Sequence, residues 1–258
     1  MNTLSIKILL ISVIIISLWL IASMLLTLQS NNLIFQNSIS RVQIPKGNYK
    51  EEFIQSNGNN IGIRIIEATL PSDKYILYTH GNTGRLENFI SELSKKGTVY
   101  SPTYPGYAES EGAPSQQGTL DAAINTYNYM VEVKGIPENK IIIVGQSLGG
   151  SVAAFVASKK PNANKLVLIN TFASVQSMCW KSYSILCVFS NGIFNTAQYA
   201  QDIRLDVVHF GYTGDQTIPY DETLKLSKYF KSAKTYKMIT LDKYSHTRPN
   251  WDVVLPLI

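Results

Sequence analysis

A short turn of the sequence GQSLG, residues 145–149, joins an apolar run to a helix-like segment near the middle of the chain. The run at 140–144 is mostly isoleucine and valine, and the residues after the turn are rich in alanine and valine. A strand that enters a helix through so tight a turn strains the central residue, and flanking glycines give it room. The pattern predicts that the Ser147 hydroxyl stands above a sheet edge as a nucleophile, at the positive end of the helix. A glycine-rich connection with an incidental serine is the alternative.

A nucleophilic serine needs a base and an acid that orients the base. Where the serine lies on a tight strand-to-helix turn, the acid and then the base follow it along the chain. Of the three histidines, His246 lies in the loop after an expected strand at 235–241, where it can reach a serine at the carboxyl edge of a parallel sheet. A surface loop histidine is the alternative. His80 is better interpreted as a buried residue that braces a loop, and His209 as a core histidine within a strand.

Asp215 is the carboxylate expected to orient His246. It follows an expected strand at 206–210 and precedes an expected helix, which places it at the sheet edge that carries the base. A carboxylate there can hold the imidazole in one tautomer and stabilise its protonated form. Asp221 and Asp242 compete for this role, but Asp221 has the position of a helix-start residue. Asp242 lies too close to the strand that carries the base.

Two backbone N–H groups have to stabilise the oxyanion that such a serine creates. The residue after the nucleophile, Leu148, supplies the first. The second comes from the loop after an expected strand at 74–79, where Gly81 allows a sharp turn that directs the N–H of Asn82 into the site.

These motifs, from about residue 33 to residue 246, occur in an order that resembles a known family. Besides Ser147 and His246, the matching segments are LIF at 33–35, HGN at 80–82, YPGY at 104–107, EGAPS at 111–115, LINTF at 168–172 and Asp215 with IP at 218–219. The chain is similar to the α/β-hydrolases, and among them to the single-pass, membrane-anchored abhydrolase-domain group. It departs from the family pattern around the acid, where Gly211 replaces a His-Gly pair, and on both sides of His246.

The resemblance implies an α/β-hydrolase fold for a catalytic domain spanning residues 31–258. Strand-like runs alternate with amphipathic segments at 88–96, 117–134, 147–159 and 220–230, which predicts a mostly parallel central sheet with helices on both faces. An Asn-Gly turn at 57–58 predicts an antiparallel hairpin before them. The aromatic-rich segment 174–199 is expected to form a short cap, with an ordinary helix packed on the sheet as the alternative.

Residues 1–30 are expected to form an uncleaved membrane anchor, a single transmembrane helix. No charged residue occurs from Ile8 to Leu28, and at about 1.5 Å per residue this stretch spans roughly 30 Å of hydrocarbon. A cleaved signal peptide, which is usually shorter, and a buried core helix are the alternatives. Lys7 is the nearest basic residue, which favours an amino end inside and a catalytic domain on the non-cytoplasmic side.

Charge and cysteine content limit the partners and the cofactors. The net charge is +5, but the 23 basic residues are scattered, and we expect no nucleic-acid partner. Neither metal-ligand spacing nor a dinucleotide fingerprint is present, so we expect no metal and no cofactor. Cys179 and Cys187 are expected to be two separate buried thiols, because on one helix their Cα atoms lie ~12 Å apart, beyond the ~7 Å limit for a bridge. A bridge would require a bend near residues 181–184.

The sequence as a whole predicts a membrane-anchored serine hydrolase that cleaves carboxylic ester or thioester bonds through an acyl-enzyme. Ser147 attacks the carbonyl, His246 takes and returns the proton, and Asp215 orients His246. The N–H groups of Asn82 and Leu148 stabilise the oxyanion. The resemblance implies a carboxylesterase, lipase or acyl-thioesterase, acting on a small acyl ester, a lipid or an acylated protein. A serine peptidase of the same fold and a catalytically silent scaffold are the alternatives, and the oligomeric state is left open.

Overall fold

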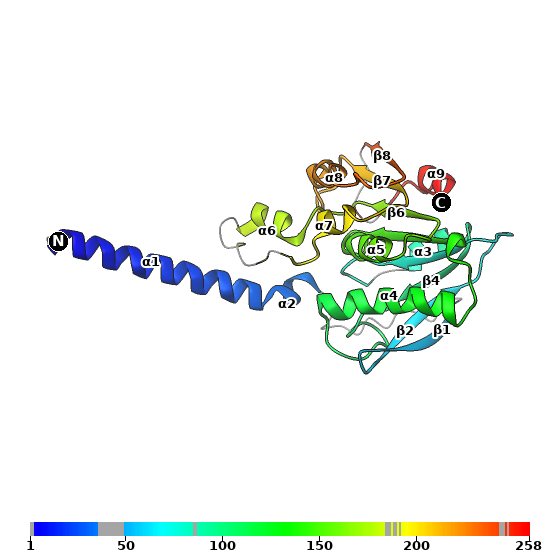
Figure 1. Cartoon of the computed structure of the whole chain (residues 1–258), viewed down its shortest axis with the longest axis horizontal. Coiled ribbons are helices and arrows are strands. Elements are labelled where there is room, and N and C mark those ends of the chain that lie inside the picture. The colour runs from blue at the N-terminus through cyan, green and yellow to red at the C-terminus, as the bar shows by residue number, and fades with distance from the viewer. Residues whose placement is uncertain are drawn as a thin grey trace.

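An eight-stranded sheet forms the centre of the globular part of the chain (Figure 1). The structure is a computed structural model that describes residues 3–35, 49–84, 87–183, 187, 190, 192–242, 246 and 248–258. The strands are β1 (Lys50–Ser56), β2 (Asn59–Ile66), β3 (Tyr75–Thr79), β4 (Thr98–Pro102), β5 (Ile141–Gln146), β6 (Lys165–Ile169), β7 (Asp206–Tyr212) and β8 (Thr235–Leu241). Their spatial order is β1-β2-β4-β3-β5-β6-β7-β8.

The sheet is mostly parallel, as the sequence predicts. The two pairs β1–β2 and β2–β4 are antiparallel, and every pair from β4–β3 to β7–β8 is parallel. Asn57 and Gly58 connect β1 to β2 with φ values of 52° and 77°, and positive φ at both residues is the requirement of a tight hairpin turn. Because five strands in a row are parallel to β4, their carboxyl ends meet at one edge of the sheet.

Helices cover both faces of the sheet. They are α3 (Glu87–Leu93), α4 (Gln116–Glu132), α5 (Leu148–Lys159), α6 (Val175–Tyr183), α7 (Thr196–Ala200), α8 (Tyr220–Ser227) and α9 (Trp251–Val254), with short 3₁₀ turns at Glu138–Lys140 and Leu255–Leu257. Helices α4, α5, α7 and α8 share one hydrophobic core with the sheet, and α3 and α9 share the other. Alternate residues of a strand point to opposite faces, so in β5 Ile143 enters the first core and Ile142 the second. The continuous apolar run of β5 follows from burial on both sides.

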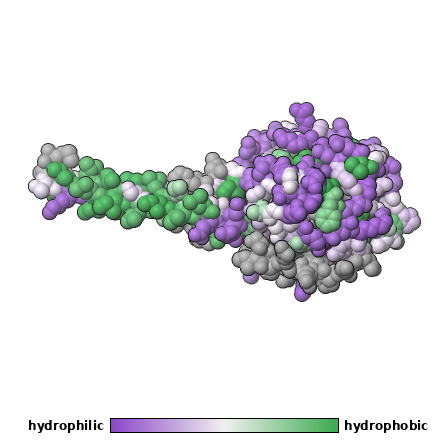
Figure 2. Space-filling model, turned by 90° about the horizontal axis from the view of Figure 1, so that it is seen from below, coloured by the Kyte–Doolittle hydropathy of each residue, from purple (hydrophilic) through white to green (hydrophobic). Residues whose placement is uncertain are grey.

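Helix α1 (Thr3–Leu28) projects away from the globular part, and α2 (Ser30–Ile34) connects it to the domain (Figure 1). In Figure 2 α1 is an apolar rod beside a mainly hydrophilic body. It is long and apolar enough to cross a membrane. Its large side chains are exposed, with Leu18 at 61% and Ile15 at 61%. That exposure excludes a buried core helix and leaves a membrane span or a signal sequence.

The segment 174–199 divides into two parts with different surroundings. Helix α7 packs on α5, where Tyr199 makes an edge-to-face contact with Phe155 at 5.5 Å between ring centroids. Helix α6 lies on the side of the domain from which α1 departs (Figure 1). Only the α7 part therefore fits the description of an ordinary packing helix.

The expectation of two separate thiols is wrong. Cys179 and Cys187 form a disulfide with their Cα atoms 5.8 Å apart. This distance is less than half of the ~12 Å that eight residues span along a helix, so the two cysteines do not lie on one continuous helix.

Candidate active site

Ser147 occupies the sharp turn between β5 and α5. Strand β5 ends at Gln146 and α5 begins at Leu148, and Ser147 between them has φ 57° and ψ −125°. A positive φ is strained for a residue with a side chain, and it persists only where the surroundings enforce it. The Ser147 N–H donates to the Ile169 carbonyl at 3.0 Å, and the Thr171 hydroxyl donates to the Ser147 carbonyl at 2.8 Å. The end of β6 thus holds the serine in the conformation that the motif predicts.

The glycines beside the turn allow its backbone to pack without side chains. A Cβ atom at Gly149 would lie 2.0 Å from the carbonyl oxygen of Thr79, at the end of β3. A Cβ atom at Gly145 would lie 2.4 Å from the carbonyl oxygen of Gly149 itself. Both distances are far inside van der Waals contact, so the close approach of β3, β5 and α5 depends on glycine at these positions.

The structure brings together the serine, histidine and aspartate that the sequence predicts. His246 Nε2 lies 2.9 Å from Ser147 Oγ, and His246 Nδ1 lies 2.6 Å from Asp215 Oδ2. In the tautomer with the proton on Nδ1, the imidazole donates to the carboxylate and Nε2 can accept the hydroxyl proton of the serine. The three groups come from the ends of β5, β7 and β8, which all meet at one edge of the sheet.

Asp215 is held in place by the backbone that follows it. Its Oδ1 accepts hydrogen bonds from the N–H groups of Thr217 at 2.8 Å and Ile218 at 2.9 Å, and the residue is 5% exposed. Its other oxygen therefore remains directed at His246. The competing Asp242 instead accepts a hydrogen bond from the Thr213 hydroxyl at 3.0 Å, and Asp221 lies exposed in the first turn of α8.

Gln146 is a neighbour of His246 that sequence reasoning missed. Its Nε2 donates to the His246 carbonyl at 3.1 Å and lies 3.3 Å from His246 Nε2. The residue is buried, and its amide therefore links the turn at Ser147 to His246. The GQSLG motif contained the only available signal, since the residue before the nucleophile lies at the same sheet edge.

The two residues expected to form an oxyanion hole lie beside the serine. Asn82 and Leu148 line the same cavity as Ser147. The Asn82 carbonyl accepts a hydrogen bond from the Tyr107 hydroxyl at 2.6 Å. A Cβ atom at Gly81, just before Asn82, would lie 3.3 Å from the Ser147 Cβ. The loop after β3 therefore runs directly against Ser147.

The other two histidines are buried, neutral groups. His80 stacks on Tyr104 at 3.9 Å between ring centroids and contacts the Gly81 carbonyl through Nδ1 at 2.7 Å, and burial lowers its pKa to about 4. His209 contacts the Tyr236 hydroxyl at 3.1 Å, and burial lowers its pKa to about 3. In the described part of the chain, Nε2 of each ring lacks a hydrogen-bond partner. Both positions agree with the structural interpretation drawn from the sequence.

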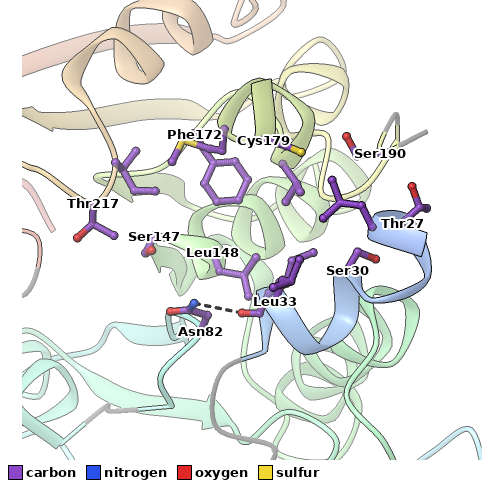
Figure 3. Close-up of a pocket in the computed structure, with 15 residues that line it drawn as sticks. Thr27, Ser30, Leu33, Asn82, Ser147, Leu148, Phe172, Cys179, Ser190 and Thr217 are labelled. Carbon is purple, nitrogen blue, oxygen red and sulfur yellow. Dashed lines mark hydrogen bonds between the residues drawn. The ribbon is translucent and has the colours of Figure 1, made fainter. Parts of the chain in front are cut away.

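A cavity of about 350 Å³ opens beside Ser147 (Figure 3). Its lining is mainly apolar and includes Leu26, Leu33, Ile34, Leu148, Phe172, Val175, Met178 and Ile218. The remainder consists of hydroxyl and amide side chains and Cys179, and Ser147 and Asn82 lie close to Leu148 (Figure 3). Among the described residues, no group of three His, Cys, Asp or Glu side chains is placed to hold a metal ion. The reactive groups that the site offers are a hydroxyl, an imidazole and a carboxylate.

Comparison with known proteins finds sequences and structures that are similar to this chain. A family profile described as "alpha/beta hydrolase fold" matches residues 74–184, a range that includes the loop after β3 and the GQSLG turn. The chain has the α/β-hydrolase fold. Protein bem46 of Schizosaccharomyces pombe is 29% identical over 184 residues, which are 66% of this chain and 60% of the yeast protein. The match thus spans less than two thirds of that relative.

Solved structures show the same fold at low sequence identity. An α/β-hydrolase from Vibrio vulnificus superimposes with a TM-score of 0.71 at 20% identity, covering 88% of this chain and 92% of that one. An esterase from Pyrococcus furiosus superimposes with a TM-score of 0.65 at 15% identity, covering 81% of this chain and 88% of that one. At these identities the likeness concerns the fold, and the activity has to be argued from the site.

Proposed function

We propose that this protein is a membrane-anchored serine hydrolase that cleaves carboxylic ester or thioester bonds through an acyl-enzyme. The observation that carries the proposal is the hydrogen-bonded chain from Ser147 through His246 to Asp215, with distances of 2.9 Å and 2.6 Å. At Ser147 this series of hydrogen bonds meets a cavity large enough for a small substrate. The strained conformation of the serine supports the same role, because strain of this kind gathers at functional sites.

The proposed reaction has two halves, with one proton carried by His246. In the first, Ser147 Oγ bonds to the substrate carbonyl carbon while its proton passes to His246 Nε2. The tetrahedral intermediate then expels the alcohol or thiol, which takes that proton, and the acyl group stays on the serine. In the second half, water attacks the acyl-enzyme while His246 takes a proton from it. The bond between Ser147 Oγ and the acyl carbon then breaks, Oγ takes that proton, and the carboxylic acid is released. Asp215 remains ionised throughout and stabilises the imidazolium.

The oxyanion is assigned to the backbone N–H groups of Asn82 and Leu148. Leu148 is the first residue of α5, where the free N–H groups and the helix dipole favour negative charge. Removing one donor of an oxyanion hole typically costs ~3–4 kcal/mol of transition-state stabilisation. The catalytic domain then comprises residues 31–258 with α6 as its short cap, and residues 1–30 form the anchor.

Esters and thioesters are favoured over amides by the site and by the comparisons. The solved structure from Pyrococcus furiosus is an esterase, and the cavity offers mainly apolar side chains for an acyl group. The test is hydrolysis by the full chain in detergent. We expect turnover of p-nitrophenyl acetate and of a thioacetate ester, none of a peptide p-nitroanilide, and no turnover of any of them by Ser147→Ala. Cleavage of the peptide alone would indicate a peptidase. If the wild type cleaves none of the three substrates, the result would indicate a scaffold.

We place the catalytic domain on the non-cytoplasmic side of the membrane. Lys7 before the span supports this orientation, and the Cys179–Cys187 disulfide fits an oxidising compartment. A membrane-impermeant maleimide applied to intact cells tests it with Val133→Cys, because Val133 is 68% exposed. We expect Val133→Cys to react before lysis while the wild type, with both cysteines paired, does not. Labelling only after lysis would reverse the orientation.

A further inference from the structure

The wall of the catalytic cavity is built partly from the anchor itself. Five residues from the end of α1 and from α2 line the cavity together with Ser147: Leu26, Thr27, Ser30, Leu33 and Ile34. Figure 3 shows Thr27, Ser30 and Leu33 on one side of the cavity and Ser147 on the other. A helix that served only as a tether would not need to reach the catalytic serine.

Specific contacts dock this wall onto the domain. Phe35, directly after α2, is 1% exposed and makes edge-to-face contacts with Tyr107 and Phe194 at 6.4 Å and 6.0 Å between ring centroids. The Ile34 carbonyl accepts a hydrogen bond from the Asn82 side chain at 3.1 Å. The anchor therefore joins the domain at the loop that we assign to the oxyanion hole, and its end has a defined position relative to Ser147.

The opposite wall is also apolar and is braced by a covalent bond. Val175 and Met178 of α6 line the cavity, as does the disulfide-bonded Cys179. Beneath them, the buried Glu222 carboxylate accepts hydrogen bonds from the Ser177 hydroxyl and from the Ala173 N–H, the latter at 3.3 Å. These contacts fix α6 across from α1, so that the cavity has two apolar walls of which one leads back to the membrane span.

The apolar surface continues along α1 away from the serine. A second hollow beside α1 is lined by Leu20, Ile21, Met24, Thr27 and Leu28, and it shares Thr27 with the catalytic cavity. The residues after the span are polar, from Gln29 to Asn32, which puts the end of α1 at the membrane interface. An alkyl chain that lies along α1 in the bilayer thus meets apolar side chains as far as the cavity.

We infer that the end of the anchor is one wall of the acyl-binding site, and that the substrate is a membrane lipid ester whose long acyl chain reaches Ser147 along α1. The inference rests on the proposed serine hydrolase activity and adds the substrate class and the route. It commits to one occupant of the cavity, an alkyl chain with the ester carbonyl at the serine. The side chains of α1 and α2 would then set the preference for acyl-chain length.

Two neighbouring leucines of α1 provide a matched test. Leu26 lines the cavity and is half-buried, whereas Leu25 does not line it and is 53% exposed. We compare Leu26→Trp with Leu25→Trp in the full chain, using p-nitrophenyl acetate and p-nitrophenyl dodecanoate in mixed micelles. Because an indole in the cavity displaces an alkyl chain, Leu26→Trp should lose roughly tenfold or more in kcat/KM for the dodecanoate. Its kcat/KM for the acetate should fall much less, so that the ratio of dodecanoate to acetate turnover drops, and Leu25→Trp should keep both rates.

Turnover is expressed per serine that reacts with a fluorophosphonate, so misfolded protein does not count. Ser30→Leu, which fills the cavity less, and Asn32→Leu, which does not line it, repeat the test with a milder change. An unchanged dodecanoate rate in both Leu26→Trp and Ser30→Leu would overturn the inference. So would an equal loss for acetate and dodecanoate, since a wall of an acyl site acts on chain length. Absence of acetate turnover in the wild type would instead overturn the proposed function.

Discussion

The two ends of the cavity beside Ser147 are held by different kinds of contact. At the sheet end, Ser147 is fixed through its own backbone N–H and carbonyl, and Gly149 lets α5 approach β3 without a side chain. At the anchor end, side chains such as Leu26 and Leu33 form the wall, and Leu33 is 46% exposed. The sheet end can hold reacting groups to a fraction of an ångström. At the anchor end, substitution of a side chain can change the preference for acyl-chain length without moving the backbone.

Loss of the base at the sheet end should have the largest effect. His246→Ala removes the proton acceptor 2.9 Å from Ser147 Oγ, and we expect a fall in kcat/KM of ~10⁴–10⁶-fold. Because base and nucleophile act as one unit, the double variant with Ser147→Ala should lose no more than Ser147→Ala alone. Ester hydrolysis of the three variants, measured on one substrate, decides this. Additive losses would mean that the two residues do not act together.

Changing the acid should cost less than changing the base. Asp215→Asn keeps the shape of the side chain but removes the charge that stabilises the imidazolium, and the expected loss in kcat is on the order of 10⁴-fold. Asp242→Asn serves as the matched control, because Asp242 bonds to Thr213 rather than to the histidine. Normal turnover by Asp215→Asn would move the role of the acid to another carboxylate.

A pair of alanine substitutions compares the two ends directly in stability. Gly149→Ala forces a Cβ atom to within 2.0 Å of the Thr79 carbonyl oxygen, and we expect it to lower the free energy of unfolding by about 3 kcal/mol or more. Leu33→Ala removes a half-exposed side chain at the anchor end and should change it by about 1 kcal/mol or less. Urea unfolding of both variants checks the difference. Equal changes in the free energy of unfolding would contradict the difference between the sheet end and the anchor end.

A stability effect of another kind concerns His209, a buried histidine of β7 outside the proposed triad. The unfolded chain binds a proton at His209 as the pH falls below about 6.5, whereas burial in the folded protein lowers the pKa to about 3. The stability that the neutral ring contributes is therefore present above pH 6.5 and is lost as the pH falls. The loss is about 1.4 kcal/mol per pH unit for one proton.

His209→Phe keeps a ring against Phe230 and removes the titrating group. Between pH 6 and pH 4, its free energy of unfolding should fall less steeply than that of the wild type by this one-proton slope, about 1.4 kcal/mol per pH unit. Carboxylates titrate in the same range but contribute equally to both proteins. Parallel curves would show that His209 is not held neutral by burial.

Most of the fold could be predicted because its signals are local. The isoleucine run of β5, the GQSLG turn and the alanine-rich α5 each occupy consecutive residues, and the structure has them where the pattern indicates. The Asn-Gly hairpin is of the same kind. The positions of Asp215 and His246 followed from a topological rule, that parallel strands bring their carboxyl ends to one edge.

The features that sequence reasoning missed depend on contacts between distant segments. The Cys179–Cys187 bridge requires that the two cysteines do not share one continuous helix, and the sequence has no proline or glycine between them to indicate this. The Gln146 link to His246 joins residues that are 100 positions apart. The docking of Phe35 beside Tyr107, and with it the entry of the anchor into the cavity wall, likewise arises only in three dimensions.

The most direct test of the central claim is the fragmentation mass spectrum of the peptide that carries Ser147, because the same peptide also contains Ser151 and Ser158. Trypsin releases residues 141–159 as one peptide, because it cleaves after Lys140 and after Lys159. After reaction of the full chain with a fluorophosphonate, we expect one phosphonyl group on Ser147, much slower labelling in His246→Ala and none in Ser147→Ala. An unmodified peptide, or an adduct on another serine in a preparation that hydrolyses esters, would contradict the assignment of Ser147 as the nucleophile.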